Sequence, residues 1–374
     1  MQNILILKFP YSSLFGGGEK HTLILVEQMQ QKGFNFFLVS SCPVLLKEFK
    51  SRRWFAKKAW AGREPVSKGT LLLWPLVAPL AFFNLFLILL QYRFGKKVKI
   101  LYCLSLTEKI LATVPARMLG MKVFWVEHVT FERWLTKNPL KIFYRFFSRF
   151  ANVVAISQVI KRQLIEKIKV RPENITVIYN GIDLRQFSMK RFRWEKGARF
   201  NIGCVARLEK EKGIEFLIQA IKIVREFVPF VRLIIVGEGG EKKKLVWLSE
   251  RMNLKEIIQW VGHQQEIDKW YGYFDVYALP SVKRESFGIT LVEAMASGVP
   301  VVGSNLGGIP EIIDNKVNGL LAEPGSSRDL ADKLLYLFNN RGEAREMVLQ
   351  ARDKVEKNFS VERMIRDFYI LLKK

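Results

Sequence analysis

One stretch, residues 275–311, constrains the fold most, because it predicts a strand, a polar loop, a helix and a second strand in that order. The apolar run 276–279 stops at Pro280, and the pattern predicts a helix that begins near Gly288. Such units build parallel α/β sheets, in which ligands bind beyond the carboxyl ends of the strands. The first amides of the helix, at residues 286–289, suit an anion such as a phosphate.

Two carboxylates belong to this stretch, Glu285 in the loop and Glu293 inside the helix. At ~1.5 Å of rise per residue they lie roughly 6 to 10 Å apart along the helix axis. The pair is suited to accept hydrogen bonds from two sugars on either side of a bound phosphate. Spacing alone leaves two alternatives open: a solvated loop carboxylate with a helix carboxylate that offsets the macrodipole, or the acid/base pair of a glycosidase.

The chain has 374 residues, which is too long for one core and predicts two domains. Cys42, Cys103 and Cys204 each lie in or beside an apolar run, without the spacing of metal ligands. We expect reduced core cysteines and a reducing compartment. The first eight residues resemble a strand and lack a basic amino-terminal region, so we expect no signal peptide.

The net charge of +25 is unevenly distributed along the chain. Residues 1–190 contain 30 Lys/Arg and 10 Asp/Glu, whereas residues 191–374 contain 30 and 25. A basic amino-terminal half attracts anionic lipid or nucleic acid, and each basic residue near an anionic membrane contributes about 1 kcal/mol. Because no nucleic-acid-binding motif accompanies the charge, we expect a membrane partner and no nucleic acid.

Residues 71–90 are the most hydrophobic stretch, with basic residues on both sides at Lys68 and Arg93. Twenty apolar residues are long enough to span a bilayer, although two prolines and an asparagine inside the stretch weaken that interpretation. The stretch lies between predicted strands at 36–40 and 98–103, where a doubly wound sheet requires a crossover helix. Three possibilities stay open: a buried crossover helix, a crossover helix whose outer face enters one leaflet, and a true span.

Two further stretches, 47–68 and 131–150, interleave Lys and Arg with aromatic residues. This composition is typical of segments in the headgroup layer of a membrane, and a solvated surface helix is the alternative for the first of them. For residues 131–150 we expect a single basic amphipathic helix.

Three other loops carry candidate ligand-binding residues. A glycine-rich loop follows the predicted strand 3–8, and glycine allows a backbone to approach a ligand, although a flexible turn explains it equally well. His128 follows the predicted strand 122–127, a position from which a side chain can face a bound ligand. The alternative is a surface or core histidine whose hydrogen bonds are satisfied within the protein. In the loop after the strand 201–205, the guanidinium of Arg207 and the ammonium of Lys212 are suited to bind a pyrophosphate. The alternative is an exposed loop that binds no ligand. The residues are Gly16, Gly17, Gly18 and Glu19 in the first loop, and Arg207 and Lys212 in the third.

The Glu285–Glu293 spacing, with Pro-Ser before it and E-A-M-A-S-G-V-P-V-V-G-S-N-L-G-G-I-P-E after it, resembles the donor site of family 4 of the retaining GT-B glycosyltransferases. The resemblance implies an α/β fold of two Rossmann-like domains with parallel sheets that face each other across a cleft. We expect an acceptor-binding domain at 1–180, a linker at 181–199, a nucleotide-sugar-binding domain at 200–358 and a helix at 359–374 that crosses back to the first domain.

The resemblance also implies transfer of a hexose-type sugar from a UDP- or GDP-sugar to a glycan or lipid-linked acceptor, with retained configuration and no metal or cofactor. Glu285 would hold donor-sugar hydroxyls and Glu293 the ribose. His128 would lie beside the transferred sugar, although Val129 follows it where the family often has Asp, for which Glu127 or Glu132 is a possible substitute. The diphosphate would contact Arg207, Lys212, and the helix start at Gly288, Ile289 and Thr290.

The expected location is the cytoplasm, peripherally on the inner face of the membrane, in polysaccharide, cell-envelope or glycolipid synthesis. Two alternatives stay open: a GT-B nucleotide-sugar epimerase, and a membrane-bound binding protein with a degenerate site. The basic, aromatic first domain argues against the first, and the intact Arg207, Lys212, Glu285 and Glu293 argue against the second.

Overall fold

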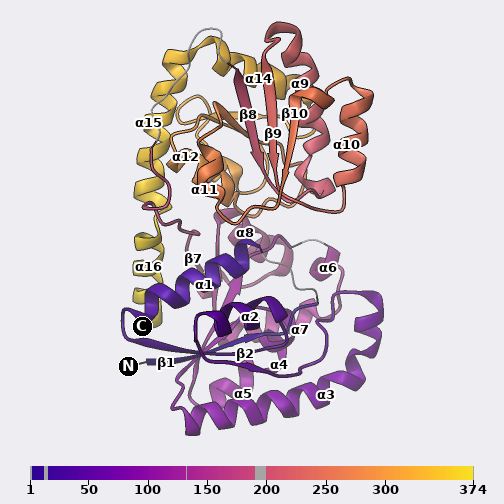
Figure 1. Cartoon of the computed structure of the whole chain (residues 1–374). Helices are drawn as coiled ribbons and strands as arrows, with labels where there is room; N and C mark the ends of the chain where they lie inside the picture. The colour runs from indigo at the N-terminus through magenta and orange to yellow at the C-terminus, as the bar shows by residue number, and fades with distance from the viewer. Residues whose placement is uncertain (1, 12–15, 132, 190–198, 374) are drawn as a thin grey trace. The chain divides into compact units, whose positions relative to one another are not determined.

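The computed structural model describes residues 2–11, 16–131, 133–189 and 199–373 (Figure 1). Its contacts divide the chain into two compact units. Unit 1 contains Met1–Tyr179 and Ile365–Lys374, and unit 2 contains Asn180–Met364. The last helix, α16 (Val361–Lys373), therefore begins in unit 2 and ends in unit 1.

Unit 1 is built on a seven-stranded parallel sheet with the order β3-β2-β1-β4-β5-β6-β7. The central strand β1 contains the run Ile-Leu-Ile-Leu, which is buried on both faces, as expected for a strand covered by helices on both sides. The strands are β1 (Gln2–Lys8), β2 (Phe34–Ser40), β3 (Ala56–Lys58), β4 (Ile100–Cys103), β5 (Lys122–Glu127), β6 (Asn152–Ala155) and β7 (Ile175–Val177).

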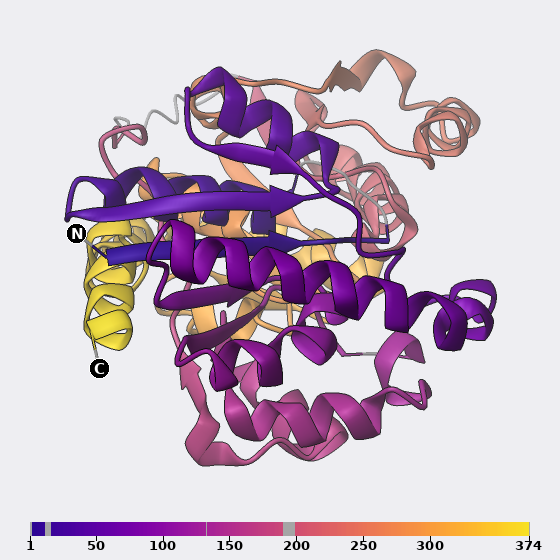
Figure 2. The same cartoon turned by 90° about the horizontal axis from the view of Figure 1, so that it is seen from below.

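The helices of unit 1 connect these strands and cover the sheet (Figure 2). Two of them, α3 and α8, continue into a π turn, at Gln91–Gly95 and Leu164–Ile168. They are α1 (Gly17–Gln30), α2 (Pro43–Ser51), α3 (Lys68–Leu90), α4 (Leu106–Leu111), α5 (Thr113–Met118), α6 (Arg133–Thr136), α7 (Lys141–Phe147) and α8 (Gln158–Gln163), followed after unit 2 by the end of α16.

Unit 2 repeats the plan with a six-stranded parallel sheet of order β10-β9-β8-β11-β12-β13. The strands are β8 (Phe200–Val205), β9 (Val231–Val236), β10 (Ile258–Gly262), β11 (Val276–Leu279), β12 (Val301–Ser304) and β13 (Leu320–Ala322). The helices are α9 (Ile214–Phe227), α10 (Lys242–Arg251), α11 (Ile267–Tyr271), α12 (Ile289–Ala296), α13 (Ile309–Ile312), α14 (Ser327–Asn339) and α15 (Arg341–Asn358), and then the start of α16.

Each sheet reverses its winding direction once, between β1 and β4 in unit 1 and between β8 and β11 in unit 2. Loops diverge from the sheet at such a switch point, which opens a crevice at the carboxyl ends of the strands. The predicted α/β fold with two Rossmann-like parallel sheets is confirmed. The three cysteines are free and buried, as expected.

The structure corrects several local predictions in unit 1. The stretch 47–68 is not one surface helix, because α2 ends at Ser51 and the short strand β3 follows it. The predicted single helix at 131–150 is wrong, because α6 and α7 are separated near Asn138, whose side-chain oxygen accepts a hydrogen bond from the amide of Leu140 (2.9 Å). An Asn-Pro pair breaks helices in this way, because proline disfavours a helical residue before it.

The apolar stretch 71–90 forms the crossover helix α3, between β3 and β4. A fully buried helix was one expectation, and it is wrong, because α3 buries only Trp74, Ala81, Leu85, Ile88 and Leu89. Together with its π turn, Lys68–Gly95, it is the one helix of the described chain that is long and apolar enough to cross a membrane.

Gly203 on β8 provides a test of the core of unit 2. A Cβ atom at this position would lie 2.2 Å from the ring of Phe274, a side chain that is almost fully buried. We expect Gly203→Ala to lower the free energy of unfolding by roughly 1–3 kcal/mol, because the ring has to move within a packed core. Urea denaturation of the full chain measures this change.

The matched control is Gly342→Ala, at a position near the start of α15 where no atom lies within 4 Å of an added Cβ. It should leave stability unchanged or raise it by up to about 1 kcal/mol, because alanine favours a helix. Equal effects of the two substitutions would contradict this account of the core.

Candidate functional site

In unit 2, loops that are far apart in the sequence meet at the carboxyl edge of the sheet. The amides of Val282 and Lys283, after β11, donate to the carbonyl of Glu211, after β8, at 2.9 and 3.2 Å. The amide of Gly308, after β12, donates to the carbonyl of Glu285 at 3.0 Å. Backbone hydrogen bonds therefore join these three loops, of which the loops after β8 and β11 carry the predicted donor-binding residues.

Two glycines make this close approach possible. Gly213 has φ +63°, and a Cβ on it would lie 2.2 Å from the carbonyl oxygen of Pro280. Gly307 has φ +60°, and its added Cβ would lie 2.0 Å from the carbonyl oxygen of Glu285. Any other residue at either position would both strain the backbone and push the loops apart.

Glu285 is buried in this loop cluster, with 7% of its surface exposed. Its Oε2 accepts a hydrogen bond from Lys212 Nζ at 2.7 Å and from Ser281 Oγ at 2.9 Å. The alternative of a solvated loop carboxylate is therefore wrong for Glu285. Lys212 and Glu285 form an ion pair that links the loop after β8 to the loop after β11.

Glu293 lies inside α12 and is only 1% exposed. Tyr271 donates a hydrogen bond to Glu293 Oε2 at 2.8 Å. Burial raises the pKa of Tyr271 well above its ordinary value, and the charge of Glu293 adds to the shift, so the phenol stays protonated and donates. No motif in the sequence points to Tyr271, because it comes from α11, 22 residues before its partner.

The remaining residues predicted to bind the donor lie at the same edge of the sheet. Helix α12 begins at Ile289 after Gly288, which has φ +100° and serves as the N-cap. The hydroxyl of Thr290 lies 2.7 Å from that of Tyr277. Arg207 is exposed, and its guanidinium forms no ion pair with any residue that the structure describes. The structure thus provides an exposed cation and a helix N-terminus beside a buried, paired carboxylate.

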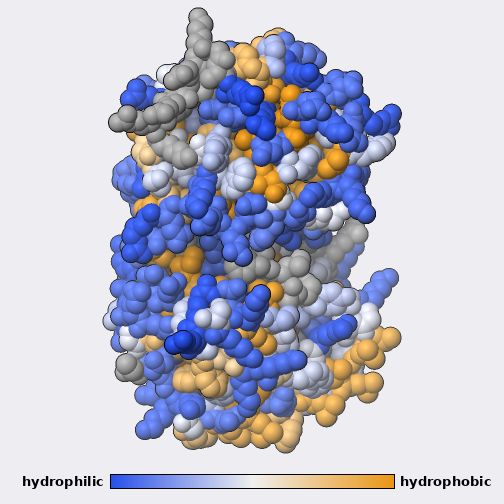
Figure 3. All heavy atoms as spheres, viewed as in Figure 1, coloured by the Kyte–Doolittle hydropathy of each residue, from blue (hydrophilic) through white to orange (hydrophobic). Residues whose placement is uncertain are grey.

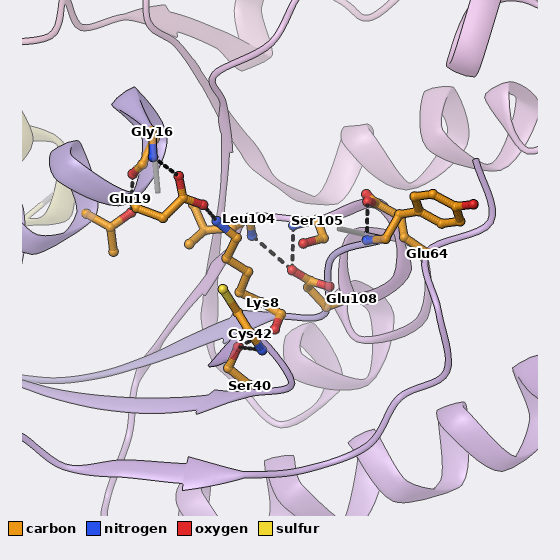
Figure 4. A network of polar contacts seen from close by, with 12 residues as sticks. Lys8, Gly16, Glu19, Ser40, Cys42, Glu64, Leu104, Ser105 and Glu108 are labelled. Carbon is orange, nitrogen blue, oxygen red and sulfur yellow. Dashed lines mark hydrogen bonds and ion pairs between the residues drawn. The ribbon is translucent and has the colours of Figure 1, made fainter. Parts of the chain in front are cut away.

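In unit 1, the glycine loop leads into α1. The backbone amide of Gly16 donates to Glu19 Oε2 at 3.1 Å, and Glu19 Oε1 forms an ion pair with Lys8 at the end of β1 (Figure 4). Glu19 therefore holds the loop against the strand. Gly17 is exposed at the first position of the helix.

His128, after β5, lies against this loop. An added Cβ on Gly18 would be 3.3 Å from His128 Cγ, and the ring of His21 lies 4.7 Å from the His128 ring in an edge-to-face arrangement. Burial lowers the pKa of His128 well below its ordinary value, and the neighbouring His21, Lys8 and Lys109 lower it further. His128 is thus a neutral imidazole at physiological pH. No sequence motif pointed to His21, although Gly18 and His21 are three residues apart on one face of α1.

Buried carboxylates lie beneath this edge of unit 1. Glu127, one of the two possible substitutes for the family's Asp, is buried and accepts a hydrogen bond from Lys109 Nζ at 2.6 Å and another from Tyr144. Glu132, the other possibility, lies outside the described residues. Glu108 accepts a hydrogen bond from the amide of Leu104 at 3.1 Å.

Within the described residues, no group of three or more His, Cys, Asp or Glu side chains is arranged to hold a metal ion.

Comparisons to known proteins agree with the architecture of the two units. Residues 187–354 match the family model described as "Glycosyl transferases group 1", and residues 15–186 match the one described as "Glycosyltransferase Family 4". The chain belongs to family 4 of the GT-B glycosyltransferases.

Similar proteins extend the comparison. The glycosyltransferase is 29% identical over 275 residues to N-acetyl-alpha-D-glucosaminyl L-malate synthase of Bacillus anthracis, covering 71% of each chain. It is 32% identical over 235 residues to the amylovoran biosynthesis glycosyltransferase AmsK of Erwinia amylovora, covering 61% of this chain and 57% of that one. The solved structure of Anabaena Alr3699/HepE in complex with UDP has a TM-score of 0.83 at 21% identity, with full coverage of both chains, which establishes the shared fold.

The Lys212–Glu285 pair gives a stability prediction. Replacing Lys212 with Met leaves the carboxylate of Glu285 buried without its cation, so we expect the free energy of unfolding to fall by about 3–5 kcal/mol. The double variant Lys212→Met/Glu285→Gln should recover part of the loss, because no unpaired charge remains. Urea denaturation of the two variants measures the difference.

The control Lys210→Met changes an exposed lysine in the same loop and should alter stability by less than about 0.5 kcal/mol. A Lys212→Met protein as stable as this control would show that the ion pair contributes nothing.

Glu108 gives a prediction about pH. Burial, with the nearby Glu64 adding to it, raises the pKa of Glu108 from its ordinary 4.5 to about 8, against the opposing effect of amide hydrogen bonds. The folded state therefore binds the proton more tightly than the unfolded state, and this contribution to stability is complete below pH 4.5 and is lost as the pH rises towards 8.

Glu108→Gln should remove this dependence. We expect the variant to gain stability relative to the unmodified protein by roughly 1 kcal/mol per pH unit between pH 5 and 8. Denaturation midpoints at several pH values measure the slope, and a difference between the two proteins that is constant with pH would refute the assignment.

Proposed function

We propose that this glycosyltransferase transfers a sugar from a nucleotide diphosphate sugar to a hydroxyl of a glycan or lipid-linked acceptor, with retained anomeric configuration. The observation that carries the proposal is the loop cluster of unit 2, in which Lys212 fixes Glu285 directly before the N-terminus of α12. A diphosphate at that N-terminus would have the sugar on the side of Glu285.

The leaving diphosphate is stabilised by protein cations in this proposal. The exposed guanidinium of Arg207 forms two parallel hydrogen bonds to phosphate oxygens, and the amides of Ile289 and Thr290 at the helix start bind the adjoining phosphate. Lys212 keeps two ammonium protons beyond the one that it donates to Glu285. These groups supply the charge that a divalent ion would otherwise provide, so the reaction needs no bound metal.

Glu285 orients the donor sugar. Both of its hydrogen bonds use Oε2, and among the described residues Oε1 accepts none, so we assign Oε1 to a sugar hydroxyl. We assign the ribose hydroxyls to Glu293, whose carboxylate is oriented by Tyr271. Fixed carboxylates of this kind hold the donor in one pose, which lowers the entropic cost of reaching the transition state.

We assign the acceptor side of the reaction to unit 1. The neutral imidazole of His128 has ring nitrogens that form no hydrogen bond with the described residues, and we assign one of them to a sugar hydroxyl. The glycine loop at 16–18 lets the backbone approach the acceptor, with Glu19 and Lys8 holding it in place. In the transfer, the bond from C1 to the diphosphate oxygen breaks while the acceptor oxygen bonds to C1 on the same face, and the acceptor proton goes to the leaving diphosphate.

A uridine nucleotide is the first choice of donor, since Anabaena Alr3699/HepE was solved with UDP and with UDP-glucose. The context we propose is polysaccharide or cell-envelope synthesis at the cytoplasmic face of the membrane, in line with the amylovoran biosynthesis glycosyltransferase AmsK. The basic residues of 1–190 support the membrane location.

A thermal-shift screen with UDP- and GDP-sugars tests the donor. A sugar nucleotide at a hundred times its Kd should raise the stability of the folded protein by about 2.7 kcal/mol. Glu285→Ala should abolish transfer of labelled sugar from the identified donor, whereas the exposed Glu323→Ala should leave it unchanged. Unchanged turnover in Glu285→Ala would refute the site.

Metal independence has its own test. Transfer in the presence of excess chelator should proceed at the same rate as without it, because Arg207 and the helix start provide the positive potential. Arg207→Ala should lower kcat about 100-fold or more, since it removes a group that stabilises charge developing in the transition state. Activity lost with chelator and restored by a divalent ion would contradict the proposal.

A further inference from the structure

Helix α3 exposes a continuous row of large apolar side chains. Leu72 is 80% exposed and Leu76 is 73% exposed, and the row continues along the same side of the helix. Successive members are three or four residues apart, which places them on one face of an α-helix. The row consists of Leu72, Leu76, Leu80, Phe83 and Leu87, and its members are absent from the buried side that packs on unit 1.

The neighbouring helices extend this face. Helix α5 contacts α3, and the short helical turn Ser148–Phe150 contacts both α5 and α7, so these elements form one layer over the sheet of unit 1 (Figure 2). On α7, Tyr144 points to the sheet, where its hydroxyl reaches Glu127. Ile142 and Phe146, two residues to either side, therefore point away from the sheet and are exposed.

We call this surface the apolar face and define it by the row on α3 together with Met118 of α5 and Ile142, Phe143 and Phe146 of α7. Figure 3 shows hydrophobic side chains gathered along the edge of unit 1 that α3 forms. A large exposed apolar surface of this kind marks an interaction surface.

The charge around the apolar face indicates which kind of partner binds there. Residues 65–150 contain 13 Lys/Arg and only 3 Asp/Glu, and two of the three acids, Glu108 and Glu127, are buried. Exposed lysines stand at both ends of α3, at Lys68 and at Lys96 and Lys97. An apolar face with a basic rim complements the acyl chains and anionic headgroups of a lipid leaflet. A second copy of this chain, which has a net charge of +25, would be repelled.

The attachments of α3 favour one leaflet over a span. The helix connects β3 to β4, two strands of one sheet, and its buried side packs on unit 1. The side chain of Asn84 donates to the carbonyl of Trp60, and a Cβ on Gly62 would lie 2.5 Å from Val77 Cγ1. A crossing would require all of these contacts to break.

We propose that the apolar face inserts into one leaflet of an anionic membrane, with α3 lying in the plane of the interface and Lys68, Lys96 and Lys97 among the phosphates. At ~1.5 Å per residue, the 23 residues of α3 extend about 34 Å along the surface. One consequence rests on the proposed function: the acceptor is a lipid-linked sugar or a lipid in the same leaflet.

Vesicle flotation of the full chain tests the insertion. The protein should bind vesicles of phosphatidylcholine with phosphatidylglycerol and bind much less to phosphatidylcholine alone. The variant Leu76→Ser/Leu80→Ser/Phe83→Ser should reduce binding by about tenfold or more, because it removes apolar area from the inserted row. The matched control, Phe227→Ser/Trp247→Ser/Tyr273→Ser, changes three exposed apolar residues of unit 2 and should bind normally.

Unchanged flotation of the α3 variant would overturn the proposal. Light scattering measures the oligomeric state of both proteins. If the unmodified protein is a dimer and the α3 variant is a monomer with normal flotation, the apolar face is a contact between copies. That result would also overturn the proposal. The substituted positions are exposed, and unchanged denaturation midpoints will show that the variants fold.

Topology distinguishes insertion from a span. The three native cysteines are buried, so single variants Lys68→Cys and Lys96→Cys accept an environment-sensitive fluorophore selectively. On vesicles, external dithionite should bleach both labels, because both ends of α3 lie on the outer surface. Protection of one label would show a span and refute insertion into one leaflet.

Sugar-nucleotide thermal shifts keep the two proposals separate. The α3 variant should retain the donor-induced shift while losing flotation. A protein that floats but shows no shift with any donor would refute the proposed function and leave the membrane inference standing.

Discussion

The Lys212–Glu285 ion pair organises the loops of unit 2. Without it, the loop after β11 would present a buried carboxylate with no cation, and that loop also leads into α12. The pair works together with two glycines that bring the backbones within contact distance. The cost of desolvating the two charges offsets much of their attraction, so the pair adds little net stability. Its main effect is to fix one arrangement of the loops.

The polar groups of unit 1 are arranged differently from those of unit 2. The carboxyl edge of the sheet of unit 1 lies over buried acids, and burial keeps Glu108 protonated up to about pH 8 and His128 neutral. Glu19 and Lys8 neutralise each other beneath the glycine loop. The result is an edge with little net charge, which suits neutral sugar hydroxyls, whereas the cations of unit 2 suit a diphosphate.

Helix α3 has two different apolar sides. Its buried side completes the core under the sheet, and its outer row is as apolar as a membrane-spanning helix. A chain in water alone would place polar residues on that outer row, because exposed leucines promote aggregation. The proposed leaflet contact removes this conflict.

The sequence by itself determined the parallel sheets, the strands that lead into the candidate loops and the order of those loops, because apolar runs, glycine turns and the Glu285–Glu293 spacing are local signals. It could not decide whether Glu285 was solvated, because its partners Lys212 and Ser281 come from two different segments. Nor could it find Tyr271 beside Glu293 or His21 beside His128, since those contacts arise only when separate helices and strands pack. The side of α3 that faces outwards was likewise decided by tertiary packing, because a helix that is apolar all round has no periodicity from which its buried face could be read.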